Sequence, residues 1–227
     1  MADLSRTHDM HEILLLNPNT STETTAMMVA IARSCVPSGY TVSGETAARG
    51  VPMILDAEHL HAAGGEVVES WARHVGKVSG IVISAFGDPG IDLLRGLTDV
   101  PIVGICESSI LEAARGGRRF GIATVTPDLV KPIDASVDAL GLSGVYTGIR
   151  LTSEDPQELA SDPLRLEEAL ADAVVACIEQ DGAEAVVIGG GPLGQAAIGL
   201  AHRFRVPVIA PIPAAMRKLT EILKLDL

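Results

Sequence analysis

Six short aliphatic runs punctuate this chain, and they narrow its possible folds more than any other pattern in it. They cover residues 13–16, 80–83, 100–105, 120–123, 185–188 and 206–209. Longer stretches with helical spacing lie between them, at 21–34, 59–77, 108–114 and 163–181. Runs of four to six residues that are apolar on both faces and alternate with helices are typical of a parallel sheet covered on both sides. The sequence therefore predicts an α/β fold.

The aliphatic runs also repeat. VPIV at 100–103 recurs as VPVI at 206–209, and GIVI at 80–83 is echoed by AVVI at 185–188, a separation of about 105 residues in both cases. The first run, ILLL, corresponds more loosely to GIAT in the second half of the chain. The alternative is that a Val-Pro pair followed by aliphatic residues simply recurs in α/β proteins. The common order and spacing favour two similar halves.

We therefore expect two pseudo-symmetric lobes, each a parallel sheet flanked by helices, with a cleft between them. The first lobe is predicted to hold residues 1–105 together with 213–227, where a C-terminal helix starts at Pro213. The second is predicted to hold residues 106–212.

Charge and cysteine content limit the possible partners. Lys and Arg number 17 against 29 Asp and Glu, a formal charge of −12. This balance disfavours nucleic acid and anionic membranes as partners. No apolar stretch reaches the roughly 18 residues that span a bilayer, so we expect a soluble, cytoplasmic protein. Three widely spaced cysteines indicate neither a disulfide framework nor a metal site.

Polar residues and glycines gather directly after the predicted strands, where open parallel sheets bind their ligands. Asn17 and Thr20 follow the first run, Thr124 follows the fourth, and a GGGP turn begins at Gly189. The glycine turn is neither a P-loop nor a dinucleotide fingerprint, so we predict no nucleotide at this site. A carboxylate, amide or imide oxygen held by backbone amides and hydroxyls is the expected ligand group. Capping of the following helix is the alternative role of the segment at 17–21.

Four groups at the strand ends are candidate acids, bases or nucleophiles. Ser84 and Asp88 lie in the loop after 80–83, and Cys106 and Glu107 follow the run at 100–105. Asp88 precedes a proline, so a turn or cap role is the stronger alternative for it. A helix N-terminus lowers the pKa of a thiol, whereas a neighbouring glutamate raises it, so both roles stay open for Cys106.

Several strings in these loops resemble the hydantoin/allantoin racemase branch of the aspartate/glutamate racemase superfamily. They are NPNTS at 17–21, FGDPG at 86–90, VGI at 103–105 with Glu107 after it, and the glycine turn at Gly189. The resemblance covers nearly the whole chain in order. It implies two facing α/β lobes, cofactor-independent chemistry on a small molecule, and a homo-oligomer.

The resemblance also implies two catalytic cysteines, one from each lobe, and this chain has neither. Ala85 stands before the FGDPG string and Gly190 stands in the glycine turn, at the positions where the family has cysteine. Val125 and Ala210 depart from the family pattern as well. Alanine and glycine cannot transfer a proton, so proton transfer by two thiols is not supported.

Three interpretations follow. The first is a racemase-like or isomerase-like enzyme acting beside a carbonyl of a small hydantoin-like or amino-acid-derived substrate, with Ser84, Asp88, Cys106 or Glu107 as the reacting group; decarboxylation or hydrolysis is the alternative on this scaffold. The second is a racemase whose cysteines were replaced to trap substrate. The third is a non-catalytic small-molecule binder. The residues expected to bind substrate are Asn17, Thr20, Phe86, Thr124, Gly189 and Gly191.

Overall fold

The computed structural model describes residues 11–225. The strands are β1 (His11–Asn17), β2 (Tyr40–Thr46), β3 (Gly80–Ile83), β4 (Ile102–Gly104), β5 (Phe120–Thr124), β6 (Tyr146–Leu151), β7 (Ala185–Ile188) and β8 (Val208–Ile209). The helices are α1 (Thr22–Cys35), α2 (Ala57–Ala72), α3 (Ile91–Arg95), α4 (Ile105–Ala113), α5 (Val130–Ala139), α6 (Pro156–Ala160), α7 (Pro163–Glu179), α8 (Gly194–Leu200) and α9 (Pro211–Leu225).

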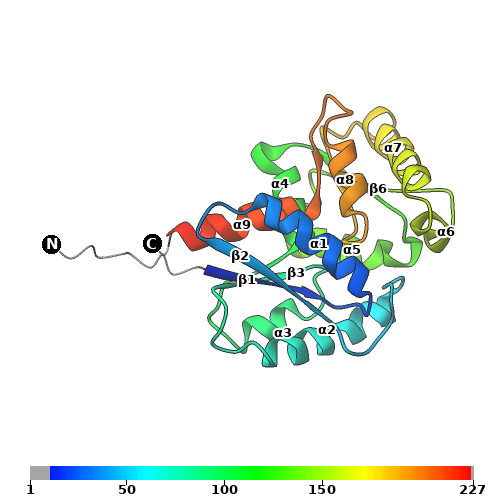
Figure 1. Cartoon of the computed structure of the whole chain (residues 1–227). Coiled ribbons are helices and arrows are strands. Elements are labelled where there is room, and N and C mark those ends of the chain that lie inside the picture. Colours follow the sequence, from blue (N-terminus) through cyan, green and yellow to red (C-terminus); the bar gives the residue numbers. More distant parts are fainter. Residues whose placement is uncertain (1–10, 226–227) are drawn as a thin grey trace.

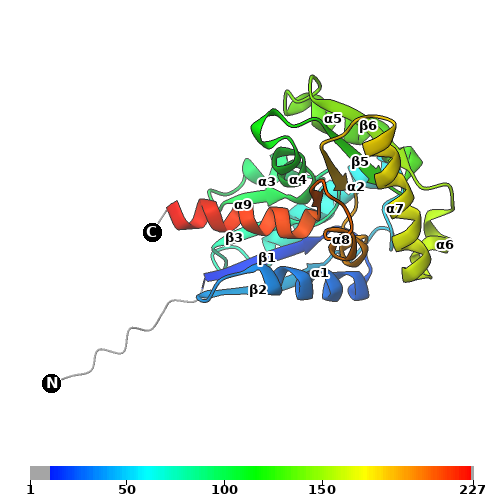
Figure 2. The same cartoon turned by 90° about the horizontal axis from the view of Figure 1, so that it is seen from above.

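The strands form two four-stranded parallel sheets with the same order. The first sheet runs β2-β1-β3-β4 and the second runs β6-β5-β7-β8. The repeated runs occupy equivalent places, since β3 and β7 lie beside the leading strand of their sheets and β4 and β8 form one edge. The predicted α/β class and the duplicated plan are confirmed. Figures 1 and 2 show the two sheets with their helices.

Two strands were not predicted. β2 and β6 form the opposite edges of the two sheets, and their sequences, YTVSGET and YTGIRL, mix polar residues and glycine with the apolar ones. Both strands are only partly buried, so they do not need the continuous apolar run by which the other strands were recognised. The edge strands β4 and β8 are fully buried and do have such a run.

The apolar core explains why the inner strands are apolar on both faces. Leu14 and Leu16 of β1 pack with residues of α2 and α3 in one cluster. Ile13 and Leu15 point to the other face, into a cluster that also contains residues of α1, α4, α5 and α9 and of the second sheet. A third cluster joins the far face of the second sheet to α7 and α8. The middle cluster is thus shared by both lobes.

Some predicted boundaries shift. The run at 100–105 is strand only from Ile102 to Gly104, because α4 begins at Ile105 rather than at residue 108. The C-terminal helix begins at Pro211 rather than Pro213 and packs against α1, α4, β3 and β4. The exact division of the chain into lobes stays a prediction. Across residues 11–225, none of the helices has the length and apolar character that crossing a membrane requires.

Candidate active site

The loops that follow β1, β3, β5 and β7 meet at a small cavity, which we call the interlobe pocket. Its volume is about 40 Å³. It is lined by Asn19, by residues 84–86, by residues 125, 126 and 129, and by residues 189–193. Met53 and Ile54, from the loop between β2 and α2, complete the wall. The carboxyl ends of strands from both sheets therefore converge on one place, as parallel sheets arrange their ligand sites.

Hydroxyl groups from both lobes border this pocket. The Ser84 hydroxyl donates to the backbone oxygen of Leu16 at 2.8 Å. From the second lobe, the Thr126 hydroxyl lies 3.4 Å from that of Thr124, which donates to the backbone oxygen of Gly189 at 2.6 Å. Because the Thr124 proton is engaged, Thr126 can donate either to Thr124 or to a ligand. Each lobe thus contributes one hydroxyl to the pocket wall.

Asn19 and the backbone amides of the loops contribute further polar groups at the pocket. The Gly190 amide donates to the oxygen of Ile188 at 3.1 Å. Within the described part of the chain, the amides of Ala85, Phe86 and Gly191 donate to no backbone or side-chain acceptor. Unengaged amides in loops after strands are donors suited to a carbonyl oxygen that gains negative charge.

Ala85 and Gly190 both line the interlobe pocket, on loops of different lobes. There is little space for a side chain at Gly190, because a Cβ there would lie 2.9 Å from Cγ and Cδ1 of Leu193. A side chain at this position would force Leu193 to move. All three cysteines lie elsewhere: Cys35 at the end of α1, Cys106 in α4 and Cys177 in α7.

Asp88 caps α4. Its carboxylate accepts the backbone N–H of Cys106 at 2.9 Å and of Glu107 at 2.7 Å. The residue is buried and has a φ of 48°, in the left-handed region that Asp tolerates better than most residues. Burial raises its pKa to about 7 against the opposing effect of the two amide donors. The carboxylate fills the space beside Gly104, where any Cβ would overlap it.

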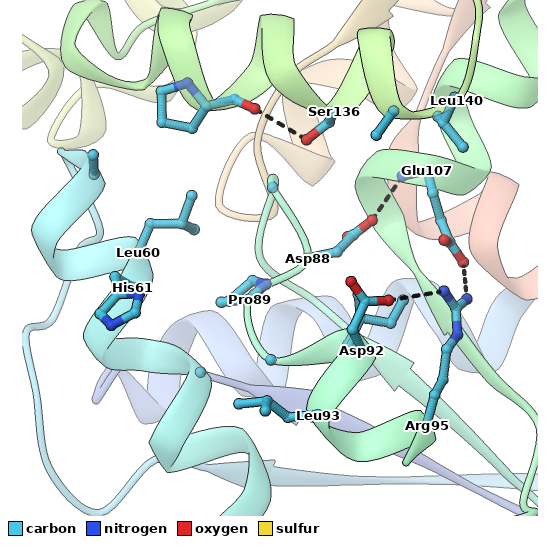
Figure 3. Close-up of a pocket in the computed structure, with 17 residues that line it drawn as sticks. Leu60, His61, Asp88, Pro89, Asp92, Leu93, Arg95, Glu107, Ser136 and Leu140 are labelled. Atoms are coloured by element: carbon cyan, nitrogen blue, oxygen red, sulfur yellow. Dashed lines mark hydrogen bonds and ion pairs between the residues drawn. The ribbon is translucent and has the colours of Figure 1, made fainter.

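Glu107 takes part in the same capping arrangement. Its carboxylate accepts the amide N–H of Gly104 at 3.3 Å and pairs with Arg95 at 2.6 Å. Figure 3 shows the Arg95 guanidinium between Asp92 and Glu107, and the Asp88 carboxylate directed at the start of α4. These groups line a separate cavity of about 650 Å³, bounded by α2, α3 and α5. The loop at 84–90 therefore separates the two cavities.

Cys106 lies in neither cavity. Its side chain is fully buried in the core cluster shared by the two lobes. Burial raises the pKa of the thiol well above its ordinary value, and the nearby Asp88 carboxylate raises it further. A thiol that stays protonated and out of contact with solvent is a weak nucleophile.

Only some of the predicted site residues line the interlobe pocket. Of the four candidate reacting groups, Ser84 alone lines the interlobe pocket, whereas Asp88 and Glu107 line the other cavity. Of the predicted substrate-binding residues, Phe86, Gly189 and Gly191 line the interlobe pocket. The other three, Asn17, Thr20 and Thr124, are not among its lining residues.

Asn17 and Thr20 form hydrogen bonds within the neighbouring loops. The Asn17 amide group donates to Asn19 Oδ1 and to Thr25 Oγ1, both at 2.9 Å, and so fixes the loop that carries Asn19. The backbone N–H of Thr20 donates to Val51 at 3.0 Å. Three residues that line the pocket were not predicted. Asn19 is next to Thr20, and Thr126 is two residues after Thr124, both of which were predicted. Met53 follows β2, a strand that the sequence pattern did not indicate.

Comparison with known proteins agrees with this architecture. The model of the family described as Asp/Glu/Hydantoin racemase matches residues 13–219, which is most of the chain. The chain belongs to the Asp/Glu/hydantoin racemase family. Two curated relatives of this racemase-family chain are hydantoin racemases. The protein from Paenarthrobacter aurescens is 30% identical over 90% of this chain and 88% of its own length. The protein from Pseudomonas sp. (strain NS671) is also 30% identical, over 91% of this chain and 83% of its own length.

Among solved structures, the allantoin racemase from Klebsiella pneumoniae superposes on this racemase-family fold with a TM-score of 0.89. It is 28% identical and the match covers 96% of this chain and 89% of the other. Sequence and structure comparisons therefore support the same branch of the family that the loop strings indicate.

Proposed function

We propose that this protein is a cofactor-independent enzyme that moves a proton at the carbon next to a carbonyl, in a small hydantoin-like or amino-acid-derived substrate. The observation that carries the proposal is the interlobe pocket, where the strand ends of both lobes present unengaged amides and one hydroxyl each. The racemase names of the relatives favour proton transfer over decarboxylation, hydrolysis or binding without chemistry.

The amides supply the main chemical effect in this proposal. A substrate carbonyl oxygen accepts from the N–H groups of Ala85 and Phe86, or of Gly191, none of which has another acceptor in the described structure. When the neighbouring C–H bond breaks, its electron pair moves into the carbonyl and leaves negative charge on that oxygen. Fixed donors aimed at this charge lower the barrier and make the carbon more acidic.

The proton itself passes to solvent hydroxide, which becomes water. Among the described residues that line the interlobe pocket there is no ionisable side chain, so the base comes from solution. Ser84 and Thr126 hold a water molecule on each side of the substrate carbon, because they reach the pocket from different lobes. The water on the opposite side returns a proton to the carbon and becomes hydroxide, which inverts the centre and restores the hydroxide used in the first step.

The experiment that tests the proposal is proton NMR in D₂O. The panel contains 5-substituted hydantoins, allantoin, aspartate, glutamate and arylmalonates, each followed with and without protein. Loss of the α-proton signal above the buffer rate, without new product signals, supports the proposal. New signals would indicate hydrolysis or decarboxylation. No exchange with any member, together with ligand-induced thermal shifts, would favour a binding protein.

The proposal extends to a homo-oligomer in the cytoplasm. Leu93 and Leu97, in and just after α3, are each 62% exposed, which is a large apolar exposure for neighbouring positions. All three cysteines are free, which fits a reducing compartment. Light scattering coupled to size exclusion measures the mass in solution, and a monomer at micromolar concentration would contradict the oligomer.

A further inference from the structure

A groove of about 670 Å³ adjoins the interlobe pocket. It is lined by residues of α1, α6, α7 and α8, so we call it the α7 groove. Met53, Pro192 and Leu193 belong to the walls of both the groove and the interlobe pocket. These three residues are therefore the partition between a cavity of about 40 Å³ and one of about 670 Å³.

Met53 is the part of this partition that can move most easily. Leu193 is 4% exposed and packs in the second-lobe core beside Gly190, and Pro192 has a fixed ring. Met53 is only partly buried, and it reaches from a first-lobe loop onto the second-lobe cluster. An unbranched methionine changes rotamer readily and adapts to the shape of a neighbour.

The loop that carries Met53 is itself anchored. The Val51 oxygen accepts the N–H of Thr20 at 3.0 Å, and Arg49 pairs with Glu66 at 3.0 Å. Ile54, next in sequence, packs on the core cluster shared by both lobes. A change of the Met53 side chain alone can therefore open the partition while the loop backbone stays in place.

The size of the interlobe pocket makes this opening necessary. A volume of about 40 Å³ is enough for about three water molecules, which is less than a five-membered ring with a substituent needs. A ring bound to the amides of Ala85 and Phe86 gains room for a substituent when Met53 turns aside. The substituent then enters the α7 groove.

The chemistry of the groove indicates which substituents it accepts. Its apolar wall includes Met27, Leu166 and Ile198, and its only charged lining residues in the described structure are Glu23 and Glu167. Transfer of an uncharged apolar group from water into the groove lowers its free energy. A carboxylate would lie near the charge of Glu23, whereas the charge of Glu167 is offset by Arg203 at 3.2 Å.

We propose that Met53 is a specificity-determining residue, whose side chain lets an uncharged apolar substituent on the substrate's α-carbon pass from the interlobe pocket into the α7 groove. The inference rests on the proposed function, because it takes the bound ring to be a hydantoin-like substrate. It predicts a dependence of binding on substituent length that changes with the size of residue 53.

The test is calorimetric binding of 5-methylhydantoin and 5-hexylhydantoin to the full chain and to Met53→Ala and Met53→Trp. Alanine removes the Met53 part of the partition, so the affinity for 5-hexylhydantoin should rise about tenfold. The affinity for 5-methylhydantoin should rise by a smaller factor, because its short substituent reaches less of the groove. Tryptophan should weaken binding of the hexyl compound by about tenfold or more. Leu164→Ala is the matched control, since Leu164 is 80% exposed on α7 and does not line the groove.

An equal ratio of the two affinities in all four proteins would overturn the inference, and so would a wild-type chain that binds neither hydantoin. The Met53→Ala variant decides the matter if the tryptophan variant does not fold. Length-dependent binding without α-proton exchange in D₂O would overturn the proposed function and leave the role of Met53 intact. α-Proton exchange of 5-methylhydantoin, with no effect of residue 53 on the two binding affinities, would overturn the role of Met53 and leave the proposed function intact.

Discussion

The Asp88 carboxylate accepts the backbone N–H of Glu107 at 2.7 Å, and its second oxygen accepts the N–H of Cys106 at 2.9 Å. These bonds tie the loop after β3 to the first turn of α4. The same loop presents the amides of Ala85 and Phe86 at the interlobe pocket. Asp88 therefore contributes to the site by fixing the loop, although its own carboxylate lies at the other cavity.

Replacement of Asp88 should change how stability depends on pH. In the unfolded chain the carboxyl ionises near 3.8, whereas in the folded protein it keeps its proton up to about 7. Between these values the folded state binds more protons, so this group makes the protein less stable as pH rises from about 4 to about 7. The Tm of wild type should therefore fall relative to the Tm of Asp88→Asn as pH rises across that range.

The matched control for Asp88 is Asp92→Asn, whose side chain is 96% exposed. A side chain this exposed contributes little to stability, so the Tm of Asp92→Asn should lie close to that of wild type. Asp88→Ala should cost more stability than Asp88→Asn, because alanine leaves both amides uncapped at a left-handed backbone position. Equal pH slopes for wild type and Asp88→Asn would contradict the assigned pKa.

Two glycines should respond to alanine in opposite directions. A Cβ at Gly104 would overlap the Asp88 carboxylate, so Gly104→Ala should lower the free energy of unfolding by about 3 kcal/mol or more. Gly65, exposed in α2, has no atom near the position of its Cβ, and Gly65→Ala should raise stability by up to about 1 kcal/mol. Urea denaturation measures both. A Gly104→Ala protein as stable as wild type would show that the Asp88 carboxylate does not occupy the space beside Gly104.

The three thiols should react at different rates. Cys35 is partly exposed, whereas Cys106 and Cys177 are fully buried. A thiol reagent added to the native protein should label Cys35 first, with the other two labelled only on unfolding, as mass spectrometry of peptides would show. Rapid native labelling of Cys106 would return it to the group of candidate nucleophiles. Cys35→Ser is the control, because the native form of this variant should not be labelled.

Ser84 and Thr126 should affect turnover more than stability. Removing either hydroxyl, by Ser84→Ala or Thr126→Val, takes away one side of the proposed water arrangement. We expect a loss of about tenfold or more in α-proton exchange with each variant, in keeping with the usual size of proton-transfer effects. Thr152→Val, at a position that does not line the interlobe pocket, should exchange at the wild-type rate. Unchanged exchange in both pocket variants would remove the hydroxyls from the mechanism.

The parts of the fold that could be predicted are those with a strong local cause. Inner strands such as β3 and β7 are buried on both faces, and that burial shows directly as aliphatic runs. The loops after them contain the pocket residues because parallel strands end at the same edge. The edge strand β2 is only partly buried and leaves a weaker pattern, so it was missed, and with it the loop that places Met53 at the pocket.

The catalytic candidates were harder to separate, because a strand end is a place both for ligands and for helix caps. Asp88 and Ser84 lie in one loop, yet the bend at 87–88, with positive φ at both residues, sends them to different cavities. Cys106 follows a strand like the others, but α4 starts one residue before it and carries the thiol into the core. Only tertiary packing distinguishes these cases.

Proton transfer at the interlobe pocket, as proposed here, needs no thiol. The most direct measurement is the rate of C5-proton exchange of 5-methylhydantoin in D₂O, by NMR, before and after alkylation of the accessible thiols. We expect exchange above the buffer rate, unaffected by alkylation and rising with hydroxide concentration. Exchange that stops on alkylation, or that never exceeds the buffer rate for any hydantoin, would contradict it.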